Sequence, residues 1–291
     1  MFAGRLNHLA LTIMTPHKLL IVTDIDACFM DENYRYEDAM EAVQALQRKG
    51  YPLVFNSSKT LAELQDLTRE LNLDTPIIAE NGGIIAVPKN SELAELCQSS
   101  TEKTWQEMGS YWISNTALSR SAILKVAHEL RSEHQFAFQG FADWAVSDVM
   151  THTGLSEEKA TLAKDRHVSE PILWQDTQER WQDFYELMQK HQIRALHGGR
   201  FIHLMSCCDK SDGLKAARSL YQKFDPKTDW TTMALGDSPN DLSMLEHADI
   251  AIIVPHPEGP RIPLQSSHMT YACYPASKGW NLAVLDRLQQ F

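Results

Sequence analysis

The hydrophobic and polar positions follow two alternating patterns along the first 86 residues. Continuous apolar runs such as "KLLIVTD" and "YPLVFNSS" are typical of strands that are buried on both faces of a sheet. Between these runs, Glu37 to Lys49 place alanine and leucine at helical spacing and stop at Gly50, a common helix end. Strands that alternate with helices of this length predict a Rossmann-like α/β fold with a parallel sheet.

The same alternation returns in the last third of the chain, whereas the middle differs. Residues 87–201 contain many aromatic side chains and mix short strand-like pieces with helical stretches. We therefore predict an α/β core formed by residues 1–86 and 202–291, with an α+β cap domain inserted at 87–201. Residues 1–16 are interpreted as a possible extension before the fold, with Met14 as an alternative start.

Composition narrows the class of protein. Hydrophobic residues make up 43% and charged residues 22%, as in ordinary globular proteins. The net charge of -11 argues against nucleic acid as a partner, and no apolar run is long enough for a membrane span. The five cysteines form no CxxC pair, so we interpret them as reduced thiols of a cytoplasmic protein. Nothing in the sequence indicates the oligomeric state.

Polar residues follow the predicted strands of the core. Ligands of open parallel sheets bind beyond the carboxyl ends of the strands, so these side chains are expected in one crevice. The strand ends and the helix starts beside them carry Asp24, Asp26, Ser57, Ser58, Glu80, Asn81, Lys210, Asp237, Asn240 and Asp241. Alone, each has a simpler interpretation: the aspartates as an acidic turn, Ser57 and Ser58 as helix caps, Lys59 and Lys210 as surface charges.

As an ordered set, these residue types fit phosphoryl transfer. An aspartate can attack phosphorus, and a second one two residues later can reach the leaving oxygen. Carboxylates such as those of Asp24, Asp237 and Asp241 are the hard oxygen ligands that Mg²⁺ prefers. Lys210 would offset the clustered carboxylates, and Ser57 would donate a hydrogen bond to a phosphoryl oxygen.

The motifs "DID", "NSSKT", "DKSDGLKAA" and "GDSPND" resemble the four sequential motifs of the haloacid dehalogenase superfamily of phosphotransferases. Within this superfamily, the chain most resembles the mannosyl-3-phosphoglycerate phosphatase family, in which "SSKT" is followed by "ENGG", as it is here. The phrases "GFADW", "TGLSEEKATLAKDRHVSEP", "HGGRFIHL" and "KGWNLAVL" are also similar to that family. The similarity covers nearly the whole chain from about His17 onward.

The resemblance implies roles for named residues. Asp24 would be the nucleophile and Asp26 the general acid and base, with Ser57 and Lys210 as phosphate contacts. Mg²⁺ would be bound by Asp24, Asp237 and the backbone carbonyl of Asp26. The supporting residues would be Ser58, Lys59, Asn240 and Asp241 around the core motifs, and Arg166, Glu170 and Arg200 in the cap. The three cap residues would face the sugar or the glycerate carboxylate, although they could equally form structural ion pairs.

The implied activity is Mg²⁺-dependent hydrolysis of a phosphorylated sugar-glycerate, mannosyl-3-phosphoglycerate first, through an aspartyl-phosphate. Within the superfamily, a glucosyl-3-phosphoglycerate phosphatase, a general sugar-phosphate phosphatase and a phosphomutase remain alternatives. A glycosyltransferase with a metal-binding DxD leaves Lys210 and "GDSPND" unused, and the intact acid pair argues against a non-catalytic phosphate-binding module. Ala27 and Cys28 replace the usual Gly-Thr, which is harmless for alanine only if the backbone φ there is negative.

Overall fold

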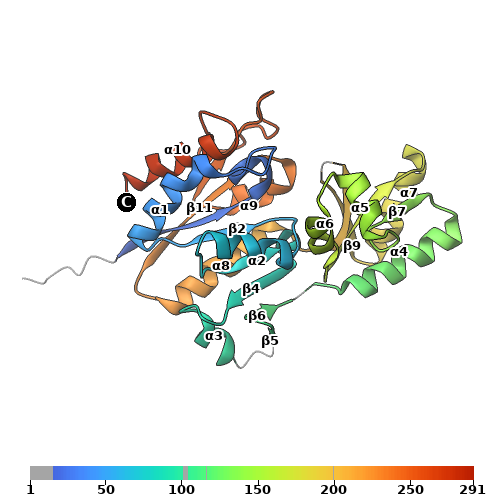
Figure 1. The fold of residues 1–291 in the computed structure, drawn as a ribbon, viewed down its shortest axis with the longest axis horizontal. Coiled ribbons are helices and arrows are strands. Elements are labelled where there is room, and N and C mark those ends of the chain that lie inside the picture. Colours follow the sequence, from blue (N-terminus) through green and yellow to red (C-terminus); the bar gives the residue numbers. More distant parts are fainter. Residues whose placement is uncertain (1–15, 101–103, 116, 199) are drawn as a thin grey trace, which may run out of the picture.

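The computed structural model describes residues 16–100, 104–115, 117–198 and 200–291, which form two sheets with flanking helices (Figure 1). The larger sheet has nine strands in the order β13-β12-β11-β1-β2-β3-β4-β6-β5. Its strands are β1 (His17–Thr23), β2 (Leu53–Asn56), β3 (Ile77–Ala79), β4 (Ile84–Pro88), β5 (Trp105–Met108), β6 (Tyr111–Ser114), β11 (Asp229–Gly236), β12 (Ile250–Ile253) and β13 (Met269–Tyr271). The six strands from β13 to β3 are parallel, and β4, β6 and β5 continue the sheet antiparallel.

Helices cover both faces of this sheet. The helices of this part are α1 (Met40–Lys49), α2 (Leu61–Glu70), α3 (Ala94–Gln98), α8 (Lys210–Phe224), α9 (Leu242–His247) and α10 (Ala276–Leu288). Leu19 and Ile21 of β1 belong to the apolar cluster under α1, α2 and α10, whereas Leu20 and Val22 belong to the cluster under α8 and α9. Alternate side chains of one strand thus enter two cores, which is why the run "KLLIVTD" is apolar throughout.

The smaller sheet has four strands in the order β7-β8-β10-β9, all antiparallel to their neighbours. Its strands are β7 (Phe138–Gly140), β8 (Ser169–Trp174), β9 (Ile193–Gly198) and β10 (Phe201–Ser206). With it pack α4 (Arg120–His134), α5 (Val146–Thr153), α6 (Glu157–Lys164) and α7 (Gln178–Lys190). We call this unit, residues 120–206, the cap, and the rest of the described chain the core.

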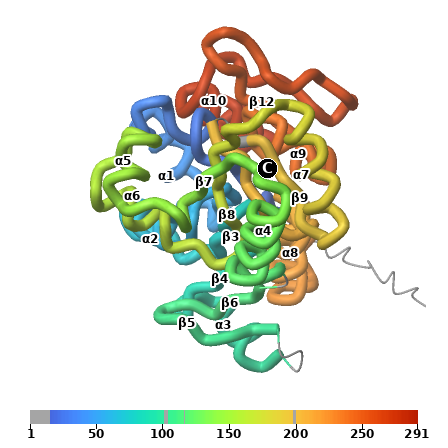
Figure 2. The backbone as a smooth tube through the Cα atoms, turned by 90° about the vertical axis from the view of Figure 1, so that its right-hand side faces the viewer, coloured from blue at the N-terminus to red at the C-terminus, as the bar shows by residue number. Residues whose placement is uncertain are grey.

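The two sheets lie side by side in the long direction of the molecule (Figure 1). Viewed from the cap, α4, β7 and β8 lie in front of the core, and the β5–β6 hairpin lies at the opposite end from α10 (Figure 2). This arrangement confirms the predicted α/β core with a second α+β unit. The described part of the chain contains no helix that is both long and apolar enough to cross a bilayer.

The residues that form the cap sheet do not coincide with the interval predicted for the insertion, residues 87–201. Strands β5 and β6 extend the core sheet, and β10 continues to Ser206 within the cap sheet. The difference arises because short aromatic strands such as β6 look alike in either sheet; only pairing, here of β6 with β4, assigns them. The domain boundaries themselves remain a prediction, and the predicted extension lies almost wholly outside the described residues.

Candidate active site

Lys210 contacts both the first and the last aspartate of the predicted catalytic residues, Asp24 and Asp241. Its Nζ lies 2.6 Å from Asp24 Oδ1 and 2.5 Å from Asp241 Oδ1, although the three residues come from distant parts of the chain. Asp24 directly follows β1, where its backbone N–H donates to the carbonyl of Leu235 in β11 at 2.9 Å. The lysine is 1% exposed and its two acidic partners are also buried. A buried ammonium paired in this way holds both carboxylates in fixed positions.

The position of Lys210 is set by the start of α8. Asp209 precedes the helix and accepts a 2.7 Å hydrogen bond from the Ser211 N–H, while its own N–H donates to Asp212. Asn56, at the end of β2, donates from Nδ2 to the Lys210 carbonyl at 2.8 Å. The helix also comes very close to the sheet, since a Cβ on Gly213 would lie 2.5 Å from Ile78. The motif "DKSDG" therefore encodes both the helix start and its approach to the sheet.

Asp237 completes a group of three carboxylates with Asp24 and Asp241. One carboxylate oxygen of each lies within 4.8 Å of the others. Asp241 Oδ2 accepts 3.0 Å hydrogen bonds from the N–H groups of Asp237 and Ser238, which fixes the "GDSPND" turn. His256, which belongs to none of the sequence motifs, lies with Nε2 at 2.9 Å from Asp237 Oδ2.

The electrostatics of this group favour a bound cation. Burial raises the pKa of Asp24 well above its usual value, against the opposing charge of Lys210, and the neighbouring carboxylates raise it further. Burial and Asp241 likewise raise the pKa of Asp237 to about 7. The pKa of Lys210 is raised, because its two acidic partners outweigh the effect of burial. Of the three buried carboxylates, only those of Asp24 and Asp241 contact the ammonium of Lys210.

The residues fit a magnesium ion. All three carboxylates offer hard oxygen ligands, and Asp237 Oδ1 is buried without a hydrogen-bond partner in the described chain. An unsatisfied buried oxygen is costly unless a cation or donor meets it. Of the four predicted metal-binding residues, Asp24, Asp237 and Asp241 lie together, and the side chain of Asp26 lies outside this group.

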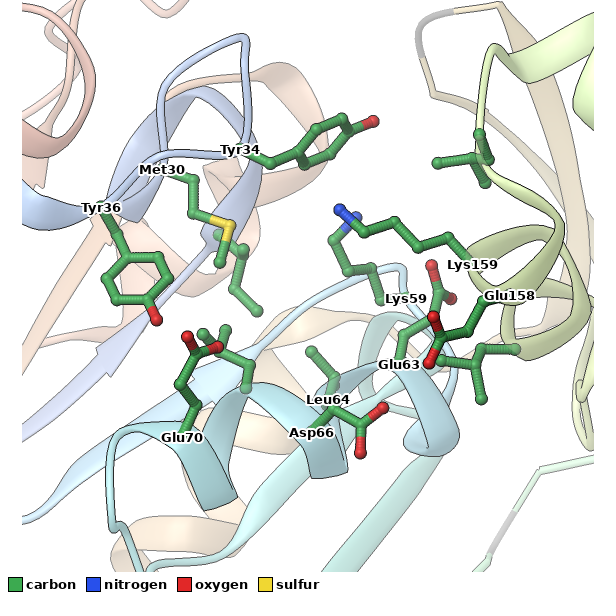
Figure 3. A pocket seen from close by; sticks show the side chains of 14 residues that line it. Met30, Tyr34, Tyr36, Lys59, Glu63, Leu64, Asp66, Glu70, Glu158 and Lys159 are labelled. Atoms are coloured by element: carbon green, nitrogen blue, oxygen red, sulfur yellow. The ribbon is translucent and has the colours of Figure 1, made fainter.

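Asp26 instead pairs with Lys59, at 2.9 Å from Asp26 Oδ2 to Lys59 Nζ. The pKa of Lys59 is raised, since the charges of Asp26 and Glu63 outweigh the effect of burial. Lys59 from the core and Lys159 from the cap both direct their ammonium groups toward the ring of Tyr34 (Figure 3). The distances to the ring centroid are 5.2 and 4.9 Å. Lys59 is therefore more than a surface charge: it positions Asp26 next to the core–cap boundary.

The structure distinguishes the two serines of "NSSKT". Ser58 lines the cavity that contains Asp24 and Asp237, whereas Ser57 is not among the residues that line it. Ser57 is 1% exposed, and its Oγ accepts from the Lys59 N–H at 3.3 Å. Asn240 also lines the cavity and contacts Asn81 through its Nδ2, at 3.4 Å. The role of Ser57 as a phosphate contact remains a prediction.

Glu80 connects the core to the cap. It is fully buried, and its carboxylate accepts from the N–H groups of His167 and Val168, at 2.8 and 3.1 Å, and from the Ser169 hydroxyl at 2.5 Å. Ser169 in turn accepts from Arg166, whose guanidinium also donates to the carbonyl of Ser58 at 3.2 Å. A core carboxylate thus fixes the segment of the cap that carries Arg166.

Two cavities lie along the core–cap boundary. The first, about 310 Å³, is lined by Asp24, Asp237 and Arg261 among others. The second, about 340 Å³, is lined by Arg166 and Arg200. Asp26, Ser58 and His203 line both. A third cavity, about 250 Å³, lies between α2 of the core and α6 of the cap and is lined by apolar, acidic and basic side chains (Figure 3).

The three predicted cap residues have different surroundings. Arg166 and Arg200 line the second cavity, as a role in binding substrate requires. Glu170 is 1% exposed and pairs with Arg120 at 2.6 Å, while its other oxygen accepts from the Ala142 N–H at 2.7 Å. These contacts match the alternative of a structural ion pair for Glu170. Its contact with substrate remains a prediction.

Sequence reasoning missed His203 and His256, because isolated histidines without ligand spacing carry no signal. It also left open the backbone at Ala27, whose φ is +57°, so the condition for a harmless alanine is not met. Cys28 beside it is fully buried, and burial raises the pKa of its thiol. All five cysteines are free thiols. Cys28 therefore fills space in the core.

Comparisons with known proteins agree with this geometry. Residues 21–256 match the model of the haloacid dehalogenase-like hydrolase family. A glucosyl-3-phosphoglycerate/mannosyl-3-phosphoglycerate phosphatase of Methanococcoides burtonii is 34% identical over 92% of this chain and 97% of its own. A phosphatase of the same name from Persephonella marina is 29% identical over 91% of this chain and 96% of its own.

Solved structures share the fold at low sequence identity. A protein of Thermoplasma acidophilum is 14% identical with a TM-score of 0.64, covering 95% of this chain and 100% of its own. The sucrose-phosphatase of Synechocystis is 15% identical with a TM-score of 0.57, covering 93% of this chain and 98% of its own. The family match spans every residue of the Asp24–Lys210–Asp237–Asp241 group, and the chain belongs to the haloacid dehalogenase-like hydrolase family.

Proposed function

We propose that this protein is a Mg²⁺-dependent phosphatase that hydrolyses mannosyl-3-phosphoglycerate or its glucosyl counterpart to the glycosylglycerate and phosphate. The observation that carries the proposal is the contact of Lys210 with Asp24 and Asp241 beside Asp237, at the carboxyl edge of the sheet. The two phosphatases of Methanococcoides burtonii and Persephonella marina, which match over nine-tenths of the chain, support the substrate class. The proposal keeps the hydrolytic chemistry that the sequence predicted for a member of the haloacid dehalogenase family.

In this proposal Asp24 is the nucleophile. A carboxylate oxygen of Asp24 attacks phosphorus, the bond from phosphorus to the substrate oxygen breaks, and Asp26 gives its proton to that leaving oxygen. Asp26 then takes a proton from water as the water attacks the aspartyl-phosphate, which frees Asp24 and releases phosphate. Lys59 holds the Asp26 side chain in place, through the contact of its Nζ with Asp26 Oδ2.

Asp24, Asp237 and Asp241, with the backbone carbonyl of Asp26, would hold Mg²⁺, which when bound offsets negative charge on the phosphoryl oxygens. Lys210 supplies a fixed positive charge at the same carboxylates. The cap excludes water and presents Arg166 and Arg200 to the anionic glycerate part of the substrate. We place this reaction in the cytoplasm, where free thiols such as these persist.

The test is phosphate release in the presence of Mg²⁺ from mannosyl- and glucosyl-3-phosphoglycerate, compared with simple sugar phosphates. We expect kcat/KM for a glycosyl-3-phosphoglycerate to exceed that for the simple esters. Equal or better turnover of simple sugar phosphates would instead indicate a general phosphatase, and transfer of phosphate to a second position of the sugar would indicate a mutase. Binding of a nucleotide-sugar, or of substrate without turnover, would support the two remote alternatives.

Replacement of the nucleophile gives the first specific prediction. Asp24→Asn removes the attacking oxygen, so phosphate release should fall roughly a thousandfold or more. Asp183→Asn, on the exposed face of α7, is the matched control and should retain wild-type turnover. Retained turnover in Asp24→Asn would refute the assigned nucleophile while leaving the substrate class open.

A further inference from the structure

His203 lies where the two boundary cavities meet. It is on β10, and its ring lines both the cavity of about 310 Å³ that contains Asp24 and the cavity of about 340 Å³ that contains Arg166. Its strand neighbours Ile202 and Leu204 belong to the apolar cluster inside the cap. Because successive side chains of a strand alternate, His203 faces away from that cluster and toward the core. A ligand that occupies both cavities therefore passes this ring.

The hydrogen-bonding capacity of His203 is not used up by the protein. The residue is 8% exposed, and its Nδ1 is buried without a hydrogen-bond partner among the described residues. A buried polar atom left in this state costs about 1–3 kcal/mol. If this position only had to fill space in the cap sheet, an apolar residue would do so without this cost. The unused capacity thus points to a partner that arrives with the ligand.

The charge state of the ring restricts the kind of partner. Burial, together with the positive charges of Arg166 and Lys210, lowers the pKa of His203 to about 3, so the imidazole is neutral near pH 7. A neutral imidazole donates from one nitrogen and accepts at the other, which suits a hydroxyl group. The guanidinium groups of Arg166 and Arg200 line the same second cavity and suit a carboxylate better.

We propose that His203 is a specificity-determining residue, which hydrogen-bonds a hydroxyl group of the polyhydroxylated part of the substrate beyond its phosphate. The inference deepens the proposed phosphatase activity and rests on it. In the second cavity, the arginines then bind the negatively charged group of the substrate, and His203 binds a sugar-like hydroxyl group. It also gives a reason for the residue in the phrase "RFIHL", which the catalytic set leaves without a role.

The experiment compares two replacements of His203 on two kinds of substrate. His203→Phe keeps a ring of similar size but removes both hydrogen-bonding nitrogens, whereas His203→Asn keeps a neutral donor and acceptor. His134→Phe, near the end of α4 on the exposed surface, is the matched control. Each variant is assayed with Mg²⁺ on the sugar-bearing ester that the wild type hydrolyses best, and on p-nitrophenyl phosphate, which has no hydroxyl groups beyond the phosphate.

We expect His203→Phe to lose roughly tenfold or more in kcat/KM on the sugar-bearing ester and to stay within about twofold of wild type on p-nitrophenyl phosphate. His203→Asn should recover most of the loss. Equal losses on both esters, or no recovery by asparagine, would overturn the assignment and leave a structural role. Unchanged kcat/KM of His203→Phe on the sugar-bearing ester would overturn it as well.

The outcome is separable from that of the proposed function. If the best ester is a simple sugar phosphate, the glycosyl-phosphoglycerate proposal fails, and His203 is judged on that sugar phosphate instead. If His203→Phe behaves like wild type on a glycosyl-3-phosphoglycerate, the proposed function stands and the inference fails. Absence of phosphate release from every ester would overturn both.

Discussion

Ala27 stores backbone strain at the centre of the site. Its φ of +57° lies in the left-handed region, where a Cβ costs roughly 1–2 kcal/mol. Ala27→Gly should therefore raise the free energy of unfolding by about 0.5–1 kcal/mol, after the extra chain entropy of glycine is subtracted. Ala216→Gly, inside α8, is the matched control and should lower it by about 1 kcal/mol. Urea unfolding measures both, and a destabilised Ala27→Gly would contradict the strain.

Lys210 is expected to be irreplaceable even by arginine. Its Nζ reaches Asp24 and Asp241 at 2.6 and 2.5 Å in a fully enclosed space, which fits a compact ammonium and not a planar guanidinium. Both Lys210→Met and Lys210→Arg should lower kcat by about a hundredfold or more. Lys215→Met, an exposed position on the same helix, should leave kcat within about twofold. Rescue by arginine in a phosphate-release assay would contradict the geometric argument.

Sequence position indicated which charged side chains of the core lie together, but it did not separate the two serines or place the cap residues. Asp24, Lys210 and Asp237 follow strand ends or begin a helix, where topology alone determines the neighbours. Ser57 and Ser58 differ by one position, and which of them lines the cavity depends on a turn that no pattern describes. Glu170 could not be assigned either, because its pairing with Arg120 depends on how α4 packs on the cap sheet.

At the scale of elements, the connection between β3 and β4 anchors the cap. Glu80 and Asn81 have φ values of +49° and +56°, and this turn directs the Glu80 carboxylate to three donors at the start of β8. Glu80→Gln places an NH₂ group against those donors and should lower the free energy of unfolding by about 2 kcal/mol. Because Arg166 is held through Ser169, KM should rise more than kcat falls.

Hydrogen exchange and steady-state kinetics check the role of Glu80. Hydrogen exchange at the amides of His167 and Val168 should accelerate in Glu80→Gln, because both amides lose a charged acceptor. Glu92→Gln, at an exposed position on the surface of the core unit, is the matched control and should leave the exchange rates of both amides unchanged. Unchanged exchange in the Glu80 variant, or a fall in kcat alone, would show that the cap is held by other contacts.

At the scale of the whole molecule, the alternation of apolar strands and amphipathic helices predicted the core strands, but it did not predict the sheet in which the β5–β6 hairpin pairs. The core strands are buried on both faces, so each reads as a continuous apolar run. The β5–β6 hairpin lies at the sheet edge, where β5 is largely exposed, and its sequence has no such run. Edge strands are assigned by pairing partners that are distant in sequence, so composition placed this hairpin in the insertion.

His203 also links the protonation of one buried group to the stability of the entire chain. Its folded pKa of about 3 lies below the ordinary value of 6.5, because burial and the charges of Arg166 and Lys210 disfavour the imidazolium. Between these values the unfolded chain binds more protons than the folded one, so its contribution is complete above pH 6.5 and declines as the pH falls toward 3. At pH 5 the loss from this group is about 2 kcal/mol.

Urea unfolding at pH 7.5 and pH 5 of the wild type and His203→Asn isolates that contribution. Asparagine does not titrate, so the wild type should lose about 2 kcal/mol more than the variant between the two pH values. His134→Asn, which removes an exposed histidine, should keep the full wild-type loss. Equal losses in the wild type and His203→Asn would mean that the folded protein accepts the imidazolium, and would favour an ionic contact of His203 with the carboxylate of the substrate over one with a hydroxyl group.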